Sequence, residues 1–325
     1  MTLFAAGALP APAVAVVQLI TASQRPLIVF HEHPDGDALG SSLALLLALR
    51  KLGKEPLAAC VDPPPQYYRF LPGSEDVAVA PREGDHDLAI LVDCADLQRA
   101  GALVQLATAC PRLVNIDHHP TNNGYGDAAW VEPVAAASAE LVVPIITALG
   151  VAVDPDIATC IYTAVLTDTG SFHYSNTTPA CLRLAGEMVA QGARPDLISE
   201  AVYEQRPRAD IELIAAGLQT LRLTDDGKVA WLSLDRAVMD ATRGDSEGIV
   251  NYGRMIAGVE VAILFREQAP GDIKVSFRSR NVDVATLASE FGGGGHPRAA
   301  GCTFHGSLAD AEATIVRRTA ECVSG

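Results

Sequence analysis

The sequence is poor in basic and aromatic side chains. It holds 24 lysines and arginines against 39 aspartates and glutamates, a formal net charge of −15, and aromatic residues make up 5% of its 325 positions. A chain this acidic does not bind long nucleic acid through general electrostatics. With 49% apolar and 19% charged residues, its composition is globular, which excludes disordered, collagen-like and coiled-coil chains.

The acidic excess is unevenly distributed. Residues 1–219 carry 12 basic and 25 acidic side chains, whereas residues 220–325 carry 12 and 14. This asymmetry favours metal ions bound by the first part and a small anion bound by the second. We therefore expect small or short substrates and no long nucleic acid among the partners.

Cysteine pairs at metal-binding spacing are absent. The seven cysteines are odd in number and none forms a C-x-x-C pair, which predicts free thiols in a reducing, cytoplasmic compartment. The apolar start of the chain has no lysine or arginine before Arg25 and is interrupted by Pro10 and Pro12, unlike a signal peptide. No later run reaches the roughly 18 apolar residues of a membrane span.

The first 20 residues instead favour an amphipathic helix, because Val14, Val17 and Ile20 follow at helical spacing. Beyond them, short apolar strands alternate with helical segments. Strands are expected at 26–31, 56–61, 88–93 and 113–116, and helices at 38–52, 138–149 and 155–167. This alternation predicts an α/β fold with a mostly parallel sheet covered by helices on both faces. Functional residues on such sheets gather at the carboxyl ends of the strands.

A length of 325 residues suits two domains. The polar, helical segment 194–220 contains two proline breaks, and we expect it to connect a first domain, 1–193, with a second, 221–325. Within the second domain the pattern predicts strands at 228–234, 259–266 and 273–278 and helices at 282–291 and 308–322. A smaller α/β domain is therefore predicted to follow the connector.

Carboxylate and imidazole side chains follow four of the apolar segments. Each cluster alone has an ordinary explanation, such as Asp37 capping a helix in an Asx turn. A calcium-binding EF-hand is excluded, because loop position twelve counted from Asp35 is Leu46 and not glutamate. Together the clusters can meet at one edge of a parallel sheet. Six side chains are the candidate metal ligands: His31, Asp35, Asp37, Asp93, His118 and Asp168.

This ligand set indicates the kind of metal. Carboxylates and imidazoles without cysteine suit Mn²⁺ or Mg²⁺, with Co²⁺ as a borderline alternative. Two ions about 3.5–4 Å apart usually share a bridging carboxylate. Such a pair lowers the pKa of a bridging water and neutralises charge on a phosphate. The sequence thus predicts two divalent ions and hydrolysis without a covalent intermediate.

A glycine run in the second half is the other candidate site. Gly292–Gly295 let the backbone approach an anion closely, and His296 and Arg298 add directed donors beside it. The ordinary alternative is a flexible surface loop. A P-loop is excluded because no Gly-Lys-Ser/Thr follows.

With these motifs in this order, the chain resembles the DHH phosphoesterase superfamily. The residues that carry the resemblance are His31-x3-Asp35-x-Asp37, Asp93, Asp117-His118-His119 and Asp168, and residues 251–301 are similar to the DHH-associated C-terminal domain. The resemblance implies two metal ions, most commonly Mn²⁺, with Asp93 bridging them, and His119 facing the substrate. It implies that Asp117 orients a neighbouring histidine. His33 stands where many relatives have asparagine.

In the second domain the resemblance implies a nucleotide-binding loop. The residues it assigns to the substrate are Arg278, Gly294, Gly295, His296 and Arg298. The short two-domain members that this chain resembles, bacterial nano-RNase and pAp phosphatase enzymes, hydrolyse very short RNAs, linear or cyclic dinucleotides and 3′-phosphoadenosine 5′-phosphate. An inorganic pyrophosphatase and a nucleotide sensor without turnover are the alternatives.

Overall fold

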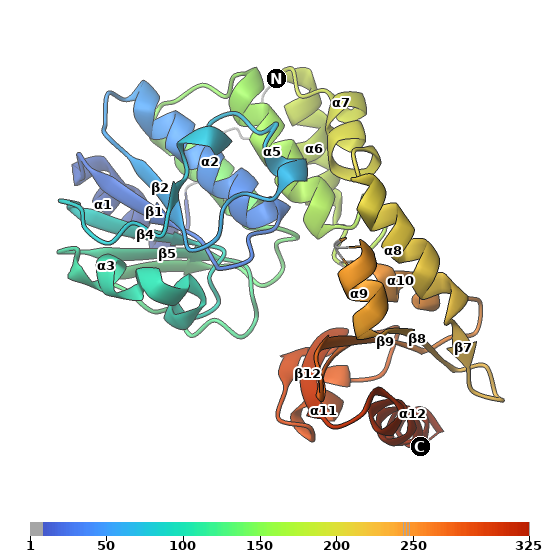
Figure 1. Cartoon of the computed structure of the whole chain (residues 1–325). Coiled ribbons are helices and arrows are strands. Elements are labelled where there is room, and N and C mark those ends of the chain that lie inside the picture. Colours follow the sequence, from blue (N-terminus) through green and yellow to red (C-terminus); the bar gives the residue numbers. More distant parts are fainter. Residues whose placement is uncertain (1–8, 243, 245, 247, 325) are drawn as a thin grey trace. The chain divides into compact units, whose positions relative to one another are not determined.

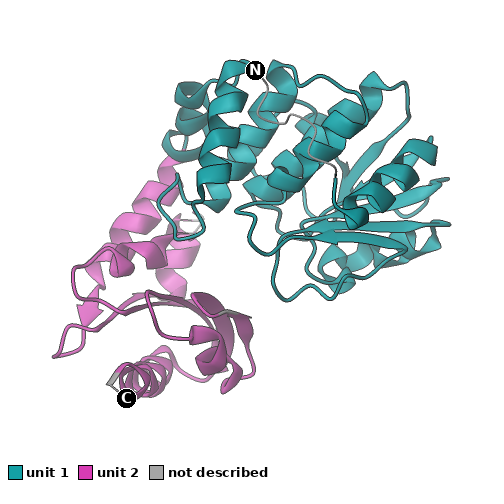
Figure 2. Ribbon diagram, turned by 180° about the vertical axis from the view of Figure 1, so that it is seen from behind, with its two compact units in different colours: residues 1–205 teal, residues 206–325 magenta. Residues whose placement is uncertain are grey.

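The computed structural model describes residues 9–242, 244, 246 and 248–324. The chain divides into two compact units, Met1–Gln205 and Arg206–Gly325 (Figure 2). The division falls within the segment 194–220 that we expected to connect two domains. Each unit has its own sheet and its own hydrophobic core.

The first unit contains a six-stranded parallel sheet. Its order is β3-β2-β1-β4-β5-β6. The strands are β1 (Pro26–Val29), β2 (Leu57–Cys60), β3 (Ala78–Val79), β4 (Leu88–Val92), β5 (Leu113–Asp117) and β6 (Ala128–Val131). β1 has β2 on one side and β4 on the other, so the strand order reverses between β1 and β4, where ligands bind in open α/β sheets.

Helices cover both faces of this sheet, as the alternating pattern predicted. Figure 1 shows α2 and α5 on one face and α3 on the other. The helices of the unit are α1 (Ala11–Ala22), α2 (Gly36–Lys51), α3 (Val104–Ala109), α4 (Ala139–Ala148), α5 (Pro155–Asp168), α6 (Pro179–Ala190) and α7 (Pro195–Ser199). The predicted α/β class is confirmed, with strand and helix ends of this unit shifted by at most two residues.

The first helix forms where its spacing predicted, but part of its buried face was assigned wrongly. Ala13, Val16 and Ile20 are buried in α1, whereas Val14 is 39% exposed. Small residues can pack closely against a sheet, so Ala13 takes a core position that we had given to a larger side chain. Among the described residues, no helix has both the length and the apolar character needed to cross a bilayer.

The second unit contains a mixed six-stranded sheet of order β11-β12-β10-β9-β8-β7. Among the described strands of this sheet, only the β8–β9 pair is parallel. Its strands are β7 (Arg222–Leu223), β8 (Val229–Leu234), β9 (Val261–Ala269), β10 (Asp272–Ser279), β11 (Gly294–His296) and β12 (Ala299–His305). Its helices are α8 (Arg208–Gln219), α9 (Arg236–Thr242), α10 (Ile249–Arg254), α11 (Val284–Ser289) and α12 (Leu308–Ser324).

The glycine run is not a free loop. Gly294 and Gly295 belong to β11 and pair with Gly301 and Ala300 of β12. At Gly295 φ is 141°, and a Cβ there would lie 2.6 Å from the carbonyl oxygen of Ala299. The close approach of two strands therefore requires glycine at this position.

Candidate metal centre

The six predicted ligands come from four places in the first unit. His31 follows β1, Asp93 follows β4, His118 follows β5, and Asp168 is the last residue of α5. Asp35 caps α2, whose first turn holds the sixth residue, Asp37. Because β1, β4 and β5 are adjacent and parallel, their carboxyl ends bring the first three to one edge of the sheet.

The structure brings these side chains together. In three groups, the ligand atoms lie within 4.8 Å of one another: His31–Asp35–Asp93, Asp37–His118–Asp168, and Asp93–His118–His119. Asp93 belongs to two of the groups and is 2% exposed. Its two oxygens face different histidines, Oδ2 toward His31 and Oδ1 toward His118. This is the arrangement expected of a carboxylate shared by two cations.

The separations between donor atoms fit ions better than hydrogen bonds. Nε2 of His31 lies 3.8 Å from Asp35 and 3.5 Å from Asp93. Nε2 of His118 lies 3.5–3.7 Å from Asp93, Asp37 and Asp168. Hydrogen bonds of this type are about 2.7–2.9 Å long. Two donors that each lie about 2.0–2.2 Å from one ion are separated by up to roughly 4.4 Å, so the donor set can hold divalent metal ions.

In His31 and His118, the contact made by Nδ1 fixes the direction in which Nε2 points. Nδ1 of His31 lies 2.8 Å from the carbonyl oxygen of Glu32, and Nδ1 of His118 lies 3.2 Å from that of Ala135. When Nδ1 donates to a backbone carbonyl, Nε2 is left as an acceptor and can bind a metal. Both imidazoles are therefore oriented in the way that metal-binding histidines usually are.

A buried serine holds two of the carboxylates, and the sequence analysis missed it. The Ser138 hydroxyl donates to Asp93 over 2.9 Å, while its backbone N–H donates to Asp37 over 2.6 Å. Ala139 N–H and the Ser41 hydroxyl also donate to Asp37. Ser138 stands directly before α4, and a serine before an apolar helical run is a recognisable cap signal. That signal marks only the start of a helix, and the Ser138 side chain makes no capping bond to α4; its contacts with the two carboxylates depend on tertiary packing.

A second polar network lies behind His119. Its Nδ1 is 2.8 Å from Oδ1 of Asp117, which is fully buried. Asn122 donates to Oδ2 of Asp117 over 2.6 Å and contacts Asn115 and the carbonyl oxygen of Cys94. The expectation that Asp117 orients a histidine agrees with this geometry. The amides were not foreseen, because nothing in their spacing marks them.

The charges of the cluster strongly shift the pKa values of its side chains. Burial opposes protonation of His31, but hydrogen bonds and charges from Asp35 and Asp93 outweigh it and raise the pKa of His31 to about 10. His118 is partly buried, which opposes its protonation, but its neighbouring carboxylates raise its pKa to about 9. Burial and the charge of Asp93 raise the pKa of Asp37 to about 7. In the absence of cations, protons thus compensate the excess of carboxylates.

The pKa values of Asp93 and Asp168 shift in opposite directions. Burial alone would raise the pKa of Asp93, but the hydrogen bond from His31 and the charges of His118 and His119 hold it below the usual range. Asp168 is partly buried, and its desolvation and the charge of Asp37 raise its pKa well above the usual range. Asp93 therefore stays ionised where both cations would need it.

Two loops of the site have unusual backbone conformations. Asp93 has φ of 59°, a left-handed conformation that aspartate tolerates. After Asp168, Gly170, Ser171 and Phe172 have φ values of 55°, 59° and 61°. For Ser171 and Phe172 such values cost about 1–3 kcal/mol each, and strain of this kind concentrates at functional sites.

His33 lies next to the cluster but outside the three donor groups. Its side chain is 87% exposed, and its Nδ1 lies 3.2 Å from Oδ2 of Asp62. Its backbone N–H also donates to Asp62 over 2.8 Å. His33 therefore links the loop after β1 to the loop after β2.

The substrate residues expected in the second unit form a group of their own at β10, β11 and β12. Arg278 is partly buried on β10 and pairs with Ala299 of β12. Gly294 and Gly295 lie on β11, and Arg298 is exposed in the turn after it. His296 ends β11, but its side chain lies outside the described part of the structure.

Comparison with known proteins agrees with this organisation. The N-terminal domain of the DHH family matches residues 25–165, and the DHHA1 domain matches residues 228–324. The bifunctional oligoribonuclease and PAP phosphatase NrnA of Thermus thermophilus is 37% identical over 90% of this chain and 88% of its own. NrnA of Bacillus subtilis is 28% identical over 88% and 91%.

A solved structure has the same fold along almost the whole chain. The exopolyphosphatase-related protein from Bacteroides fragilis matches with a TM-score of 0.89 and 27% identity. The match covers 97% of this chain and 96% of that one. Both units therefore occur together in a known protein.

Proposed function

This chain belongs to the DHH family of phosphoesterases, and from that premise we propose that it hydrolyses very short oligoribonucleotides and dinucleotides to nucleoside 5′-monophosphates. Its relatives over most of the chain are named as oligoribonucleases and PAP phosphatases. We extend the proposal to 3′-phosphoadenosine 5′-phosphate. The observation that carries it is Asp93, a buried carboxylate that belongs to two groups of potential metal ligands.

We propose that two divalent ions bind at this cluster, with Mn²⁺ preferred over Mg²⁺ and Co²⁺. His31, Asp35 and Asp93 would hold the first ion. Asp93 would also help to hold the second ion, together with Asp37, His118 and Asp168. When bound, such a pair supplies Lewis-acid activation of water and neutralisation of phosphate charge.

The chain's own residues would orient the substrate around these ions. His119 is 20% exposed and its Nδ1 faces Asp117; from this position it would donate to a phosphate oxygen. Ser138, with two hydrogen bonds, and Ala139, with one, would keep Asp93 and Asp37 in place. These contacts support a preorganised phosphate site, which is the main requirement for phosphoryl transfer.

Residues of the second unit would bind the nucleotide portion. Arg278 and Arg298 provide cationic donors beside strands in which glycines leave the backbone accessible. The second unit is also close to neutral, unlike the acidic first part. A bound nucleotide would meet less repulsion there.

A substrate panel tests the proposal. The protein is incubated with Mn²⁺ and pApA, pGpG, pAp or pyrophosphate, and the products are separated by chromatography. We expect nucleoside 5′-monophosphates from the dinucleotides and phosphate from pAp. Hydrolysis of pyrophosphate alone would favour an inorganic pyrophosphatase, and binding of the nucleotides without any product would favour a sensor.

A further inference from the structure

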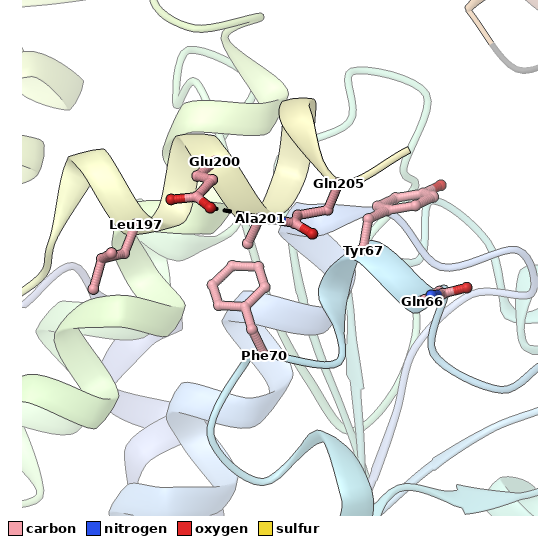
Figure 3. A pocket seen from close by; sticks show the side chains of 7 residues that line it. All are labelled: Gln66, Tyr67, Phe70, Leu197, Glu200, Ala201 and Gln205. Atoms are coloured by element: carbon pink, nitrogen blue, oxygen red, sulfur yellow. Dashed lines mark hydrogen bonds between the residues drawn. The ribbon is translucent and has the colours of Figure 1, made fainter. Parts of the chain in front are cut away.

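A pocket of about 400 Å³ lies in the first unit, and none of the proposed metal ligands lines it. One wall is η1 (Gln66–Tyr68) with the residues that follow it, and the other is the turn of π-helix η4 (Glu200–Glu204). Figure 3 shows Phe70 directed toward Ala201 on η4. The seven residues that line the pocket are Gln66, Tyr67, Phe70, Leu197, Glu200, Ala201 and Gln205.

The lining combines apolar and aromatic side chains with one carboxylate and two amides. Phe70 and Tyr67 pack partly against the core, and Leu197 is 53% exposed at the pocket. Among the seven described lining residues none is basic, and Glu200 carries a negative charge. A phosphate would be repelled there, whereas a flat, neutral group could stack on an aromatic ring.

Two hydrogen-bonded side chains of the pocket each offer an acceptor atom. Nε2 of Gln205 donates to Oε1 of Glu200 over 3.1 Å. This bond fixes the amide and leaves Oε2 of Glu200 and Oε1 of Gln205 as acceptor atoms. A ligand edge that presents N–H donors matches acceptors of this kind. Guanine has N1–H and N2–H on one edge, whereas uracil has a single N–H between two carbonyl groups.

Both walls of the pocket are connected to loops of the candidate metal centre. Asp62 accepts a hydrogen bond from His33, and Gln66 is four residues further on, so it lies within about 14 Å of Asp62. On the other wall, Tyr203 is hydrogen-bonded to Ser171 in the strained loop after Asp168. Hydrogen bonds therefore link both walls of the pocket to loops that border the candidate metal centre.

The second wall has an uncommon conformation. A π-helical turn is rare and is frequently found at functional sites. Here it places Glu200 and Gln205, the residue that follows the turn, on the same side of the helix and within hydrogen-bonding distance. We propose that this pocket binds a nucleobase of the substrate and prefers guanine, an inference that rests on the proposed function.

Steady-state kinetics with two dinucleotides tests this proposal. The wild-type protein should have a lower KM for pGpG than for pUpU. Glu200→Gln replaces one acceptor with a donor, and should raise KM for pGpG about tenfold while changing that for pUpU less than about twofold. Glu204→Gln is the matched control, because it makes the same change on the same helix outside the pocket lining. Hydrolysis of bis-p-nitrophenyl phosphate should be unchanged in both variants.

A second variant tests the stacking. Phe70→Leu keeps an apolar side chain against the core but removes the ring, and should raise KM for pGpG about fivefold or more. Its melting temperature shows whether the fold is intact. Equal KM values of the wild type for the two dinucleotides, or equal effects of Glu200→Gln and Glu204→Gln, would overturn the proposal.

A binding measurement separates this proposal from the proposed function. Saturation-transfer NMR with guanosine and uridine needs neither metal nor turnover. If the wild type hydrolyses neither dinucleotide, the proposed function fails, but preferential binding of guanosine that is lost in Glu200→Gln still supports the pocket. Binding of the two nucleosides to the same extent in wild type and variant would refute it.

Discussion

Asn122 donates a hydrogen bond of 2.6 Å to Asp117, and the other oxygen of Asp117 lies 2.8 Å from His119. The Asn122 amide thus fixes the Asp117 carboxylate, which in turn fixes the His119 imidazole. Asn122 is held in turn by Asn115 and by the carbonyl oxygen of Cys94. Tyr125 donates to the same carbonyl oxygen. The orientation of His119 therefore depends on a largely buried polar network behind it.

Replacing Asn122 should lower turnover through His119. Asn122→Ala leaves Asp117 without one of its partners, and we expect kcat to fall about 10- to 100-fold, as for other residues that orient a functional histidine. Asn123→Ala is the matched control, because Asn123 is its exposed neighbour. Steady-state kinetics on a dinucleotide measures both. A similar loss in the two variants would contradict this role.

Asp93→Ala should abolish turnover and lower metal content while leaving the fold intact. Its carboxylate is the shared member of two donor groups, so its loss affects both ions. Metal content is measured by mass spectrometry and the fold by circular dichroism. Asp96→Ala, three residues further on and outside the donor groups, serves as the control. Retention of more than about a tenth of the activity would be incompatible with a bridging role worth several kcal/mol.

The sequence predicted the parts of the centre that local pattern specifies. Apolar strands followed by acidic and imidazole residues placed His31, Asp93 and His118 at strand ends, and parallel pairing then required these ends to meet. The contribution of Ser138 depends on the tertiary packing of α4 beside Asp37. The amide of Asn122 likewise depends on the path of a loop.

The glycine run shows another limit of local pattern. Glycine weakens strands in general, so Gly294 and Gly295 were expected in a loop. Their pairing with β12 depends on strands that lie nearby only after folding. The pocket beside η4 could not be foreseen either, because Phe70 and Glu200 are 130 positions apart in the sequence.

The pKa shifts predict how the stability of the metal-free protein depends on pH. The pKa values of His31, about 10, and His118, about 9, are above those of unfolded histidine. Their stabilisation is therefore complete below about pH 6.5 and is lost as pH rises through 9 to 10. The pKa of Asp37 is also raised, to about 7, so its contribution to stability is likewise lost as pH rises from about 4 to 7.

In EDTA, the melting temperature should therefore fall as pH rises from 6 to 8.5. Mn²⁺ binds the deprotonated ligands, so the increase in melting temperature that it causes should grow with pH. Differential scanning fluorimetry measures both curves. Asp37→Asn should flatten the EDTA curve below about pH 7. A melting temperature that rises with pH in EDTA would show that these shifts do not control stability.

Removing the proposed nucleotide contacts should alter substrate preference. We expect Arg278→Ala or His296→Ala to reduce kcat/KM for dinucleotides far more than for bis-p-nitrophenyl phosphate, because binding energy from the distal part of a substrate can also support the chemical step. Arg317→Ala, an exposed arginine of α12 in the same unit, is the control. Equal losses on both substrates would contradict a specificity role for the second unit.

The acidity of the chain predicts a preference for short RNA. A net charge of −15 repels each phosphate that extends beyond the site, although at physiological salt this repulsion is screened beyond roughly 8–10 Å. We expect kcat/KM to fall as 5′-labelled RNA grows from two to about ten nucleotides, with nucleoside 5′-monophosphates as products. A time course at each length measures this. The decline should become smaller at 0.5 M salt, where screening is stronger, whereas a decline caused by steric exclusion would not change. Efficiency that stays equal or rises with length would indicate an exonuclease that follows a long strand, and the proposal of a short-RNA hydrolase would then be wrong.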